Sequence, residues 1–75
     1  MYKKFEVGTG CDPAIRKAWY EFLDHHQCYQ YTCNEVSLYL NEYQAITVIT
    51  REPRLRQFLI FNTRDGYVNF MLKFD

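Results

Sequence analysis

The segment DPAIRKAWYEFLDHH, residues 12–26, carries the clearest structural signal in the chain. Asp12 can accept hydrogen bonds from the free N–H groups of a first helical turn, and Pro13 suits the first helical position because it has no N–H to donate. The residues that follow form one apolar stripe at helical spacing: Ile15, Ala18, Trp19, Phe22, Leu23 and His26. This pattern predicts an amphipathic helix over residues 13–27.

Patterns typical of strands lie on both sides of this helix. Residues 2–7 predict a first strand, and the β-branched run of residues 46–50 predicts another. Residues 35–44 fit two structures. Helical spacing relates Val36, Tyr39, Leu40 and Tyr43. Strand alternation relates Val36, Leu38 and Leu40. Because residues 46–50 follow so closely, we favour a strand, a four-residue turn and a second strand over a helix.

The C-terminal third contains an Asp-Gly pair between two β-rich runs. Residues 55–62 and 67–74 flank Thr63-Arg-Asp-Gly66, which is a hairpin signal. One face of the last strand would hold Val68, Phe70, Leu72 and Phe74. The sequence therefore predicts one α+β domain, residues 1–75. Its small antiparallel sheet would have about four to five strands with a C-terminal meander. The helix 13–27 would pack on one face, where Trp19 and Phe22 meet the last strand.

Length and composition limit the classes of function. Seventy-five residues with 48% apolar and 24% charged side chains are typical of one ordered globular domain. Nine Lys and Arg balance nine Asp and Glu, whereas a dedicated nucleic-acid binder usually carries a basic excess. We expect a complete short gene product in the cytoplasm, with reduced cysteines, no secretory leader and no membrane span.

The best candidate for a metal site is the cluster of His25, His26, Cys28 and Cys33. A zinc ion takes four nitrogen or sulfur ligands in a tetrahedron, and Cys28 and Cys33 have a plausible spacing for two of them. A second cysteine pair is missing, because Cys11 begins the helix that His25 ends, about 20 Å away. We favour structural roles, with His26 closing the apolar stripe, His25 at a helix C-terminus and the cysteines in the core. We therefore expect neither a metal nor another cofactor.

Two features around residue 10 invite a catalytic interpretation. Gly8-Thr-Gly10 lies between a strand and a helix, but it lacks the remaining residues of a phosphate loop, and Asp12 would repel a phosphate. Cys11 at a helix N-terminus would have a lowered thiol pKa, yet His25 and His26 lie at the other end of the same helix. We predict that the protein is not an enzyme.

Positive charge gathers in residues 51–64. This segment holds a single acid, Glu52, and four arginines: Arg51, Arg54, Arg56 and Arg64. The nearby aromatic residues Phe58 and Tyr67 could stack on bases, as in sheet-based proteins that bind single strands. A small single-stranded nucleic-acid-binding protein is therefore the alternative function.

Tyrosines crowd the middle of the chain, where charge is sparse. Tyr and Arg are enriched where proteins bind proteins, because they combine a large area with hydrogen bonds at low entropic cost. We predict a partner-binding surface that consists of Tyr29, Tyr31, Tyr39, Tyr43, Arg51, Arg54 and Arg56. Its occupant would be a host protein or a second copy of the chain in a two-fold dimer.

In size and composition the chain resembles the small accessory proteins encoded by bacteriophages. The resemblance lies in a compact, aromatic-rich chain and includes no shared motif. Many such proteins bind and inhibit a host protein, so the resemblance implies a viral protein that acts on a defence or transcription enzyme in the host cytoplasm. The sequence therefore predicts a small non-enzymatic protein-binding module that inhibits its target by occlusion.

Overall fold

The computed structural model describes residues 1–28 and 33–75, with the backbone alone described at Thr9, Cys33 and Asn34. Within these residues the main elements are β1 (Lys3–Val7), α1 (Pro13–His25), α2 (Cys33–Leu40), β2 (Ala45–Thr50), β3 (Arg56–Phe61) and α3 (Arg64–Phe74). Short 3₁₀ turns occupy Gly8–Gly10 and Asn41–Tyr43. The predicted α+β class is confirmed. The described part of the chain has a three-stranded sheet and three α-helices, so the predictions of four to five strands and one helix are wrong.

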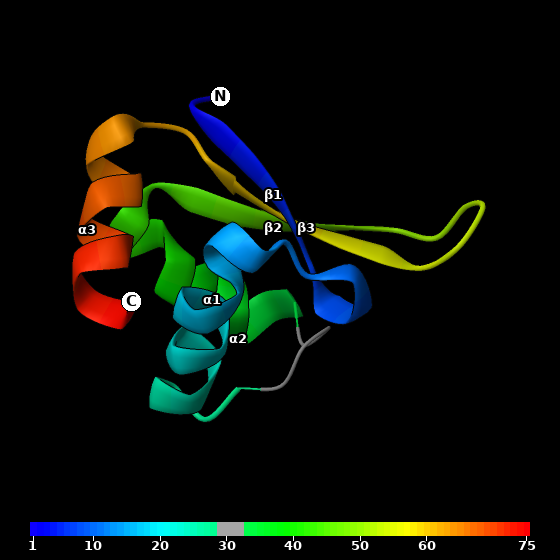
Figure 1. Cartoon of the computed structure of the whole chain (residues 1–75), viewed down its shortest axis with the longest axis horizontal. Coiled ribbons are helices and arrows are strands. Elements are labelled where there is room, and N and C mark those ends of the chain that lie inside the picture. Colours follow the sequence, from blue (N-terminus) through cyan, green and yellow to red (C-terminus); the bar gives the residue numbers. More distant parts are fainter. Residues whose placement is uncertain (29–32) are drawn as a thin grey trace.

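The sheet has the strand order β1-β3-β2, and β3 is antiparallel to both neighbours. In its register Leu59 lies between Phe5 of β1 and Thr47 of β2. The strands β1 and β2 therefore run in the same direction with β3 between them, and the chain passes from one to the other through α1 and α2. Helices α1 and α2 lie on one side of the sheet, while α3 lies at one end of it (Figure 1).

The helix α1 forms where the sequence predicts it. The Asp12 carboxylate accepts a hydrogen bond from the Ala14 N–H at 3.0 Å, and Pro13 occupies the first turn. All five aliphatic and aromatic members of its stripe are buried: Ile15, Ala18, Trp19, Phe22 and Leu23. The helix ends at His25, two residues earlier than expected, because Gln27 turns the chain with a φ of 54°.

The core is built around aromatic rings that α1 and α3 contribute. The Phe22 ring centroid lies 5.7 Å from that of Trp19 and 5.4 Å from those of Phe70 and Phe74. Such ring pairs stabilise a core beyond the area that they bury. Phe22 thus meets two of the residues that the sequence placed opposite it, although they belong to a helix.

Residues 67–74 form most of α3, and the predicted last strand and its Asp-Gly hairpin are wrong. The Thr63 hydroxyl caps the helix by accepting a hydrogen bond from the Gly66 N–H at 3.1 Å. Phe70 and Phe74, one helical turn apart, are buried, whereas Val68 and Leu72 are 37% and 79% exposed. A helix buries the aromatic pair and leaves the two aliphatic residues outside, which a strand with all four on one face could not do.

Residues 35–43 are helical, so the hairpin favoured for residues 35–44 is also wrong. Val36, Leu40 and Tyr43 are buried, and Leu38 is 69% exposed. This burial pattern is the one that helical spacing predicts, because strand alternation would have buried Leu38 together with Val36 and Leu40. The short α2 covers the sheet beside β2 (Figure 1).

The remaining strands agree with the sequence. β1 falls within residues 2–7, β2 within one residue of 46–50, and β3 within 55–62. The turn expected at 51–54 connects β2 to β3. None of the helices in the described residues is long and apolar enough to cross a membrane.

Candidate functional site

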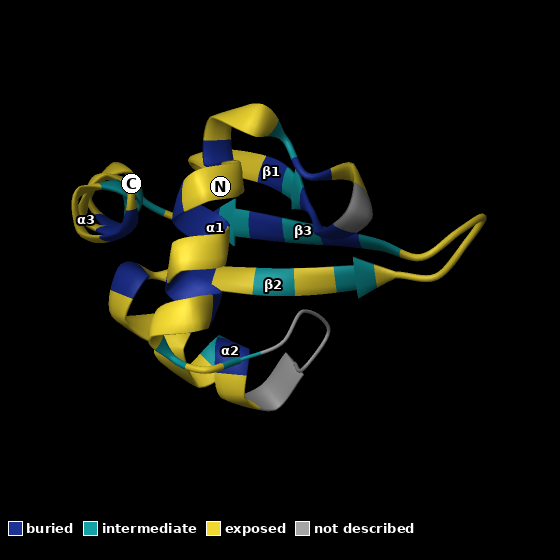
Figure 2. Cartoon of the chain, turned by 60° about the horizontal axis from the view of Figure 1, so that its bottom comes forward, coloured by how far each residue is buried: buried dark blue, intermediate teal, exposed yellow. Residues whose placement is uncertain are grey.

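One face of the sheet is packed against the helices, and the other face has no helix over it among the described elements. Buried residues alternate with more exposed ones along β3, and Ala45 begins β2 on the buried side (Figure 2). We call the second face the open face. It consists of Lys4, Glu6, Ile46, Val48, Thr50, Arg56, Phe58 and Ile60.

Apolar side chains lie next to one another on the open face. The register gives two neighbouring cross-strand rows, one of Lys4, Ile60 and Ile46 and one of Glu6, Phe58 and Val48. Ile46 is 43% and Val48 37% exposed, and the side chains of Phe58 and Ile60 are partly exposed. The centre of the open face is therefore a contiguous apolar strip across β3 and β2.

An ion pair fixes the charged end of the open face. The Arg56 guanidinium donates two hydrogen bonds to the Glu6 carboxylate, at 2.8 and 3.2 Å. These hydrogen bonds lower the pKa of Glu6, and the positive charge of Arg54 lowers it further. Bidentate pairs of this kind hold the guanidinium plane in one orientation. Glu6 is thus neutralised, and the pair presents little net charge to a partner.

Two cations flank the one aromatic ring of the open face. The Lys4 Nζ lies 4.5 Å from the centroid of the Phe58 ring, and the Arg56 Cζ lies 5.0 Å from it. Both distances are within the range of a cation–π contact. The apolar strip is therefore bordered by Lys4 on β1 and by the Arg56–Glu6 pair at the start of β3.

The connection between β2 and β3 extends the open face outward. Residues 51–55 are all exposed, and they form a hairpin tip that projects beyond the helices (Figure 1). We call them the hairpin tip. It carries Arg51 and Arg54 together with Leu55, which is 45% exposed.

Comparisons of the chain with protein-family models, with curated proteins and with solved structures found no match. The role of the open face must therefore be inferred from the shape and charge of its own side chains.

The partner-binding residues predicted from the sequence do not form one surface. Tyr43 is 3% exposed within the core, so its prediction as a surface residue is wrong. Tyr39 lies on α2, where its ring stacks on His26 at a centroid distance of 4.0 Å. Arg56 lies on the open face, on the other side of the sheet from α2. Tyr29 and Tyr31 lie outside the described residues.

The arginines of residues 51–64 are divided between two elements, because Arg64 begins α3. Arg51, Arg54 and Arg56 belong to the hairpin tip and to the start of β3. The ring closest to Arg56 is Phe58 of the same strand, with a centroid 5.0 Å from the Arg56 Cζ, and not a tyrosine. One sequence signal could have revealed this surface: the uninterrupted apolar run Phe58-Leu-Ile-Phe61 predicts a strand with two apolar faces, of which one helix can cover only one.

The histidines and cysteines do not assemble a metal site in the described part of the chain. No group of three or more His, Cys, Asp or Glu side chains comes together there. The His26 ring packs between Phe22 and Tyr39, with centroids 4.9 and 4.0 Å away, and burial lowers its pKa. The side chain of Cys33 is outside the described residues. His26 is thus partly buried at the end of the apolar stripe, with its ring against Phe22 of the core.

The thiols of Cys11 and Cys28 lack the features of a nucleophile. Burial raises the pKa of Cys11 and that of Cys28, so both thiols are protonated at neutral pH. The lowered pKa expected for Cys11 is therefore wrong, because desolvation by burial, together with the charge of Asp12, outweighs the effect of Arg16.

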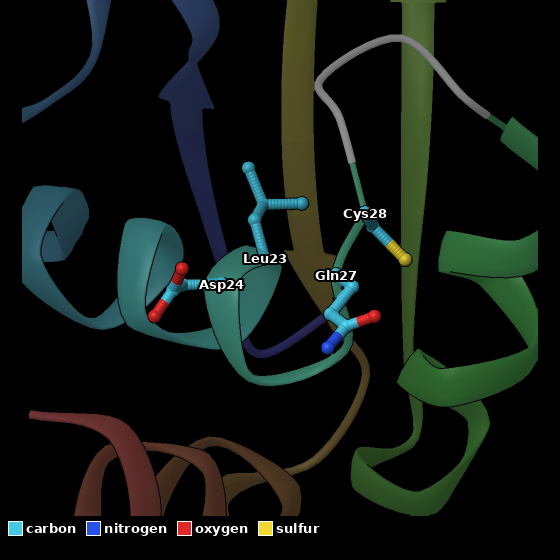
Figure 3. Close-up of a pocket in the computed structure, with 4 residues that line it drawn as sticks. All are labelled: Leu23, Asp24, Gln27 and Cys28. Atoms are coloured by element: carbon cyan, nitrogen blue, oxygen red, sulfur yellow. The ribbon is translucent and has the colours of Figure 1, made fainter.

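A hollow of about 350 Å³ lies at the end of α1, lined by Leu23, Asp24, Gln27 and Cys28 (Figure 3). Asp24 and Cys28 point away from each other in it. A carboxylate and a protonated thiol that do not converge cannot share a proton-transfer or nucleophilic step. The open face, by contrast, combines an apolar centre with a positively charged border, which suits binding.

Proposed function

We propose that the protein is a small non-enzymatic module that binds another protein through the open face and the hairpin tip. Its target would be blocked by occlusion, because a bound domain of this size covers the surface beneath it. The resemblance described above predicts that the target is an enzyme of the cell that a bacteriophage infects, and this stays a prediction.

The observation that supports this proposal is the apolar strip of Ile46, Val48, Phe58 and Ile60. Single exposed apolar residues are ordinary, but contiguous ones with a polar border are typical of association sites. Arg56 adds to this, since the Glu6 carboxylate already holds it in place and less side-chain entropy is lost on binding.

A double variant of the strip tests the proposal. In Ile46→Ser/Val48→Ser, two exposed apolar side chains become polar without loss of buried core, so the fold should persist. Leu38→Ser/Leu72→Ser is the matched control, because Leu38 and Leu72 are more exposed (69% and 79%) but belong to α2 and α3. Circular dichroism should give the same spectrum for both variants and for the wild type.

Binding is then measured on a partner that is first cross-linked to the wild-type chain in a lysate and afterwards purified. We expect the strip variant to lose at least about tenfold in affinity and the control to bind like the wild type. Equal binding by all three proteins would contradict the proposal. A parallel loss in strip variant and control would show general apolar adhesion instead.

A second candidate function follows from Lys4 and Arg56 on either side of Phe58. An aromatic ring flanked by cations is the minimal platform for a base of a single strand and its phosphates. Filter binding of poly(dT) at increasing salt distinguishes this candidate, because phosphate binding weakens steeply with salt. Salt-resistant binding of a protein together with no retention of poly(dT) would exclude it.

A further inference from the structure

Charge is divided between the two layers of the molecule. The residues of the sheet, its hairpin tip and the turn after β1 (1–11 and 45–61) hold five Lys and Arg against two Asp and Glu. The helical segments (12–44 and 62–75) hold four Lys and Arg against seven Asp and Glu. The neutral chain is thus strongly polarised, with its positive side at the sheet.

The positive charges of the open face and hairpin tip that no ion pair among the described residues neutralises lie at defined positions. Glu6 neutralises Arg56, which leaves Lys4 beside Phe58 and, at the hairpin tip, Arg51 and Arg54 against the single acid Glu52. These cations lie at the border of the apolar strip and not within it. A partner should therefore present apolar side chains at its centre and carboxylates along its edge.

The dimensions of the open face suit a single helix. Three strands span about 14 Å, and the six residues of β2 or β3 span about 20 Å. An α-helix with its side chains is about 10–12 Å wide, and about 13 residues cover 20 Å. A helix there would repeat the packing that α1 makes on the other side of the sheet.

A second copy of the chain matches this surface poorly. Two open faces placed together would bring two surfaces of the same net positive charge into contact. The helical layer of a second copy is acidic, but the apolar stripe of α1 is already buried in its own core. The apolar residues that the helical layer does expose are divided between helices, with Leu38 and Tyr39 on α2 and Val68 and Leu72 on α3. No single described helix of a second copy therefore offers an apolar stripe that matches the four residues of the strip.

A nucleic acid also matches less well than a protein. Three of the four apolar residues on the open face are aliphatic, and Ile46, Val48 and Ile60 offer no ring on which a base can stack. An apolar helix stripe, in contrast, would bury apolar area against every one of these side chains, which favours its binding.

We infer that the open face takes an amphipathic helix of a partner protein whose apolar stripe is flanked by Asp or Glu. This inference rests on the proposed function and adds the chemical class of the partner. The apolar stripe would lie on Ile46, Val48, Phe58 and Ile60, and the acids would meet Lys4 and Arg54.

A peptide-display library of sequences long enough for about four helical turns tests the inference. The folded wild-type chain selects binders, and binders lost with Ile46→Ser/Val48→Ser are kept and synthesised. We expect these peptides to carry apolar residues at spacings of three and four and an excess of Asp and Glu.

Charge reversal measures the acidic contribution. Lys4→Glu/Arg54→Glu should lower the affinity for the peptides by about tenfold or more. Lys17→Glu/Arg64→Glu is the matched control, with the same change in net charge at exposed positions of the helical layer. It should leave the affinity within about twofold. Raising the salt concentration should weaken wild-type binding and have little effect on the Lys4→Glu/Arg54→Glu variant.

The outcomes separate the inference from the proposed function. Neutral or basic peptides that depend on Ile46 and Val48 but not on Lys4 and Arg54 would overturn the acidic partner and leave the protein-binding function standing. A library that yields no peptide dependent on the open face would overturn both. If poly(dT) competes with the peptides for binding, the open face is assigned to a nucleic acid. If the protein self-associates in sedimentation and Ile46→Ser/Val48→Ser abolishes this, the open face is assigned to a second copy. Either result would overturn the inference.

Discussion

Gly66 in the first turn of α3 lies directly against the backbone carbonyl of Tyr43. A Cβ atom at Gly66 would stand 2.8 Å from the Tyr43 carbonyl carbon and closer still to its oxygen. The same region is tied by Thr63, whose hydroxyl donates a hydrogen bond to the Gln44 side chain and accepts one from the Gly66 N–H. Gly66 thus allows the start of α3 to pack closely against the turn before β2. It does not form a hairpin turn with Asp65.

Replacement of Gly66 tests this contact. We expect Gly66→Ala to lower the free energy of unfolding by about 1–3 kcal/mol, because backbone must move to admit the methyl group. Gly10→Ala is the comparison: its Cβ would meet a carboxylate oxygen of Glu6 at 3.0 Å, and this partly exposed side chain can shift together with Arg56 more easily than the Tyr43 backbone can; neither glycine has a positive φ. Gly10→Ala should change stability by less than about 0.5 kcal/mol in urea unfolding. Equal effects would mean that the contact is not a tight one.

Trp19 tests the core between α1 and the sheet. It is fully buried and stacks on Phe22, so we expect Trp19→Ala to cost about 3–5 kcal/mol and to leave much of this small protein unfolded. Tyr20→Ala changes the neighbouring residue, which is 41% exposed, and should stay close to wild type in thermal unfolding. Near-native stability of Trp19→Ala would contradict the packing of α1.

The helical state of α2 can be tested with two leucines. Leu40 is buried and Leu38 is 69% exposed. We expect Leu40→Ala to cost about 2–4 kcal/mol and Leu38→Ala less than about 0.5 kcal/mol. In a strand both residues would share one face. Similar losses of unfolding free energy for the two variants in urea would therefore support the hairpin instead of the helix.

His26 should make stability depend on pH. Burial lowers the pKa of its imidazole in the folded state, with smaller contributions from the neighbouring charges of His25 and Lys73, while Glu42 opposes the shift. In the unfolded chain the imidazole regains its ordinary pKa of about 6.5 and binds more protons than the folded state just below it. The contribution of His26 is therefore fully present above about pH 6.5 and is lost as the pH falls below it.

The variant His26→Phe isolates this effect. A phenyl ring keeps the contacts with Phe22 and Tyr39 but cannot take up a proton. We expect wild-type stability to fall more than that of His26→Phe when unfolding is measured from neutral to mildly acidic pH. Parallel curves for the two proteins would show that His26 does not titrate differently in the folded chain.

The sequence alone determined α1, because three local signals there agree: the Asp12 cap, Pro13 and a stripe with a single period. It also located β1, β2 and β3, whose β-branched and aromatic runs fit no helical stripe. Local hydrogen bonding and side-chain sterics are enough in such segments, since tertiary contacts reinforce the same structure.

Only the tertiary structure decided residues 33–43 and 64–74. Phe70 and Phe74 are four residues apart, a spacing that serves a strand face and a helix face equally well. What distinguishes the two is whether Val68 and Leu72 are buried with them, and that depends on the space that Phe22 and Tyr43 leave. The open face was decided in the same way. The run Phe58-Leu-Ile-Phe61 has two apolar faces. Leu59 and Phe61 are buried in the core on the helical side, and Phe58 and Ile60 lie on the other side, because one layer of helices can cover one side of a sheet.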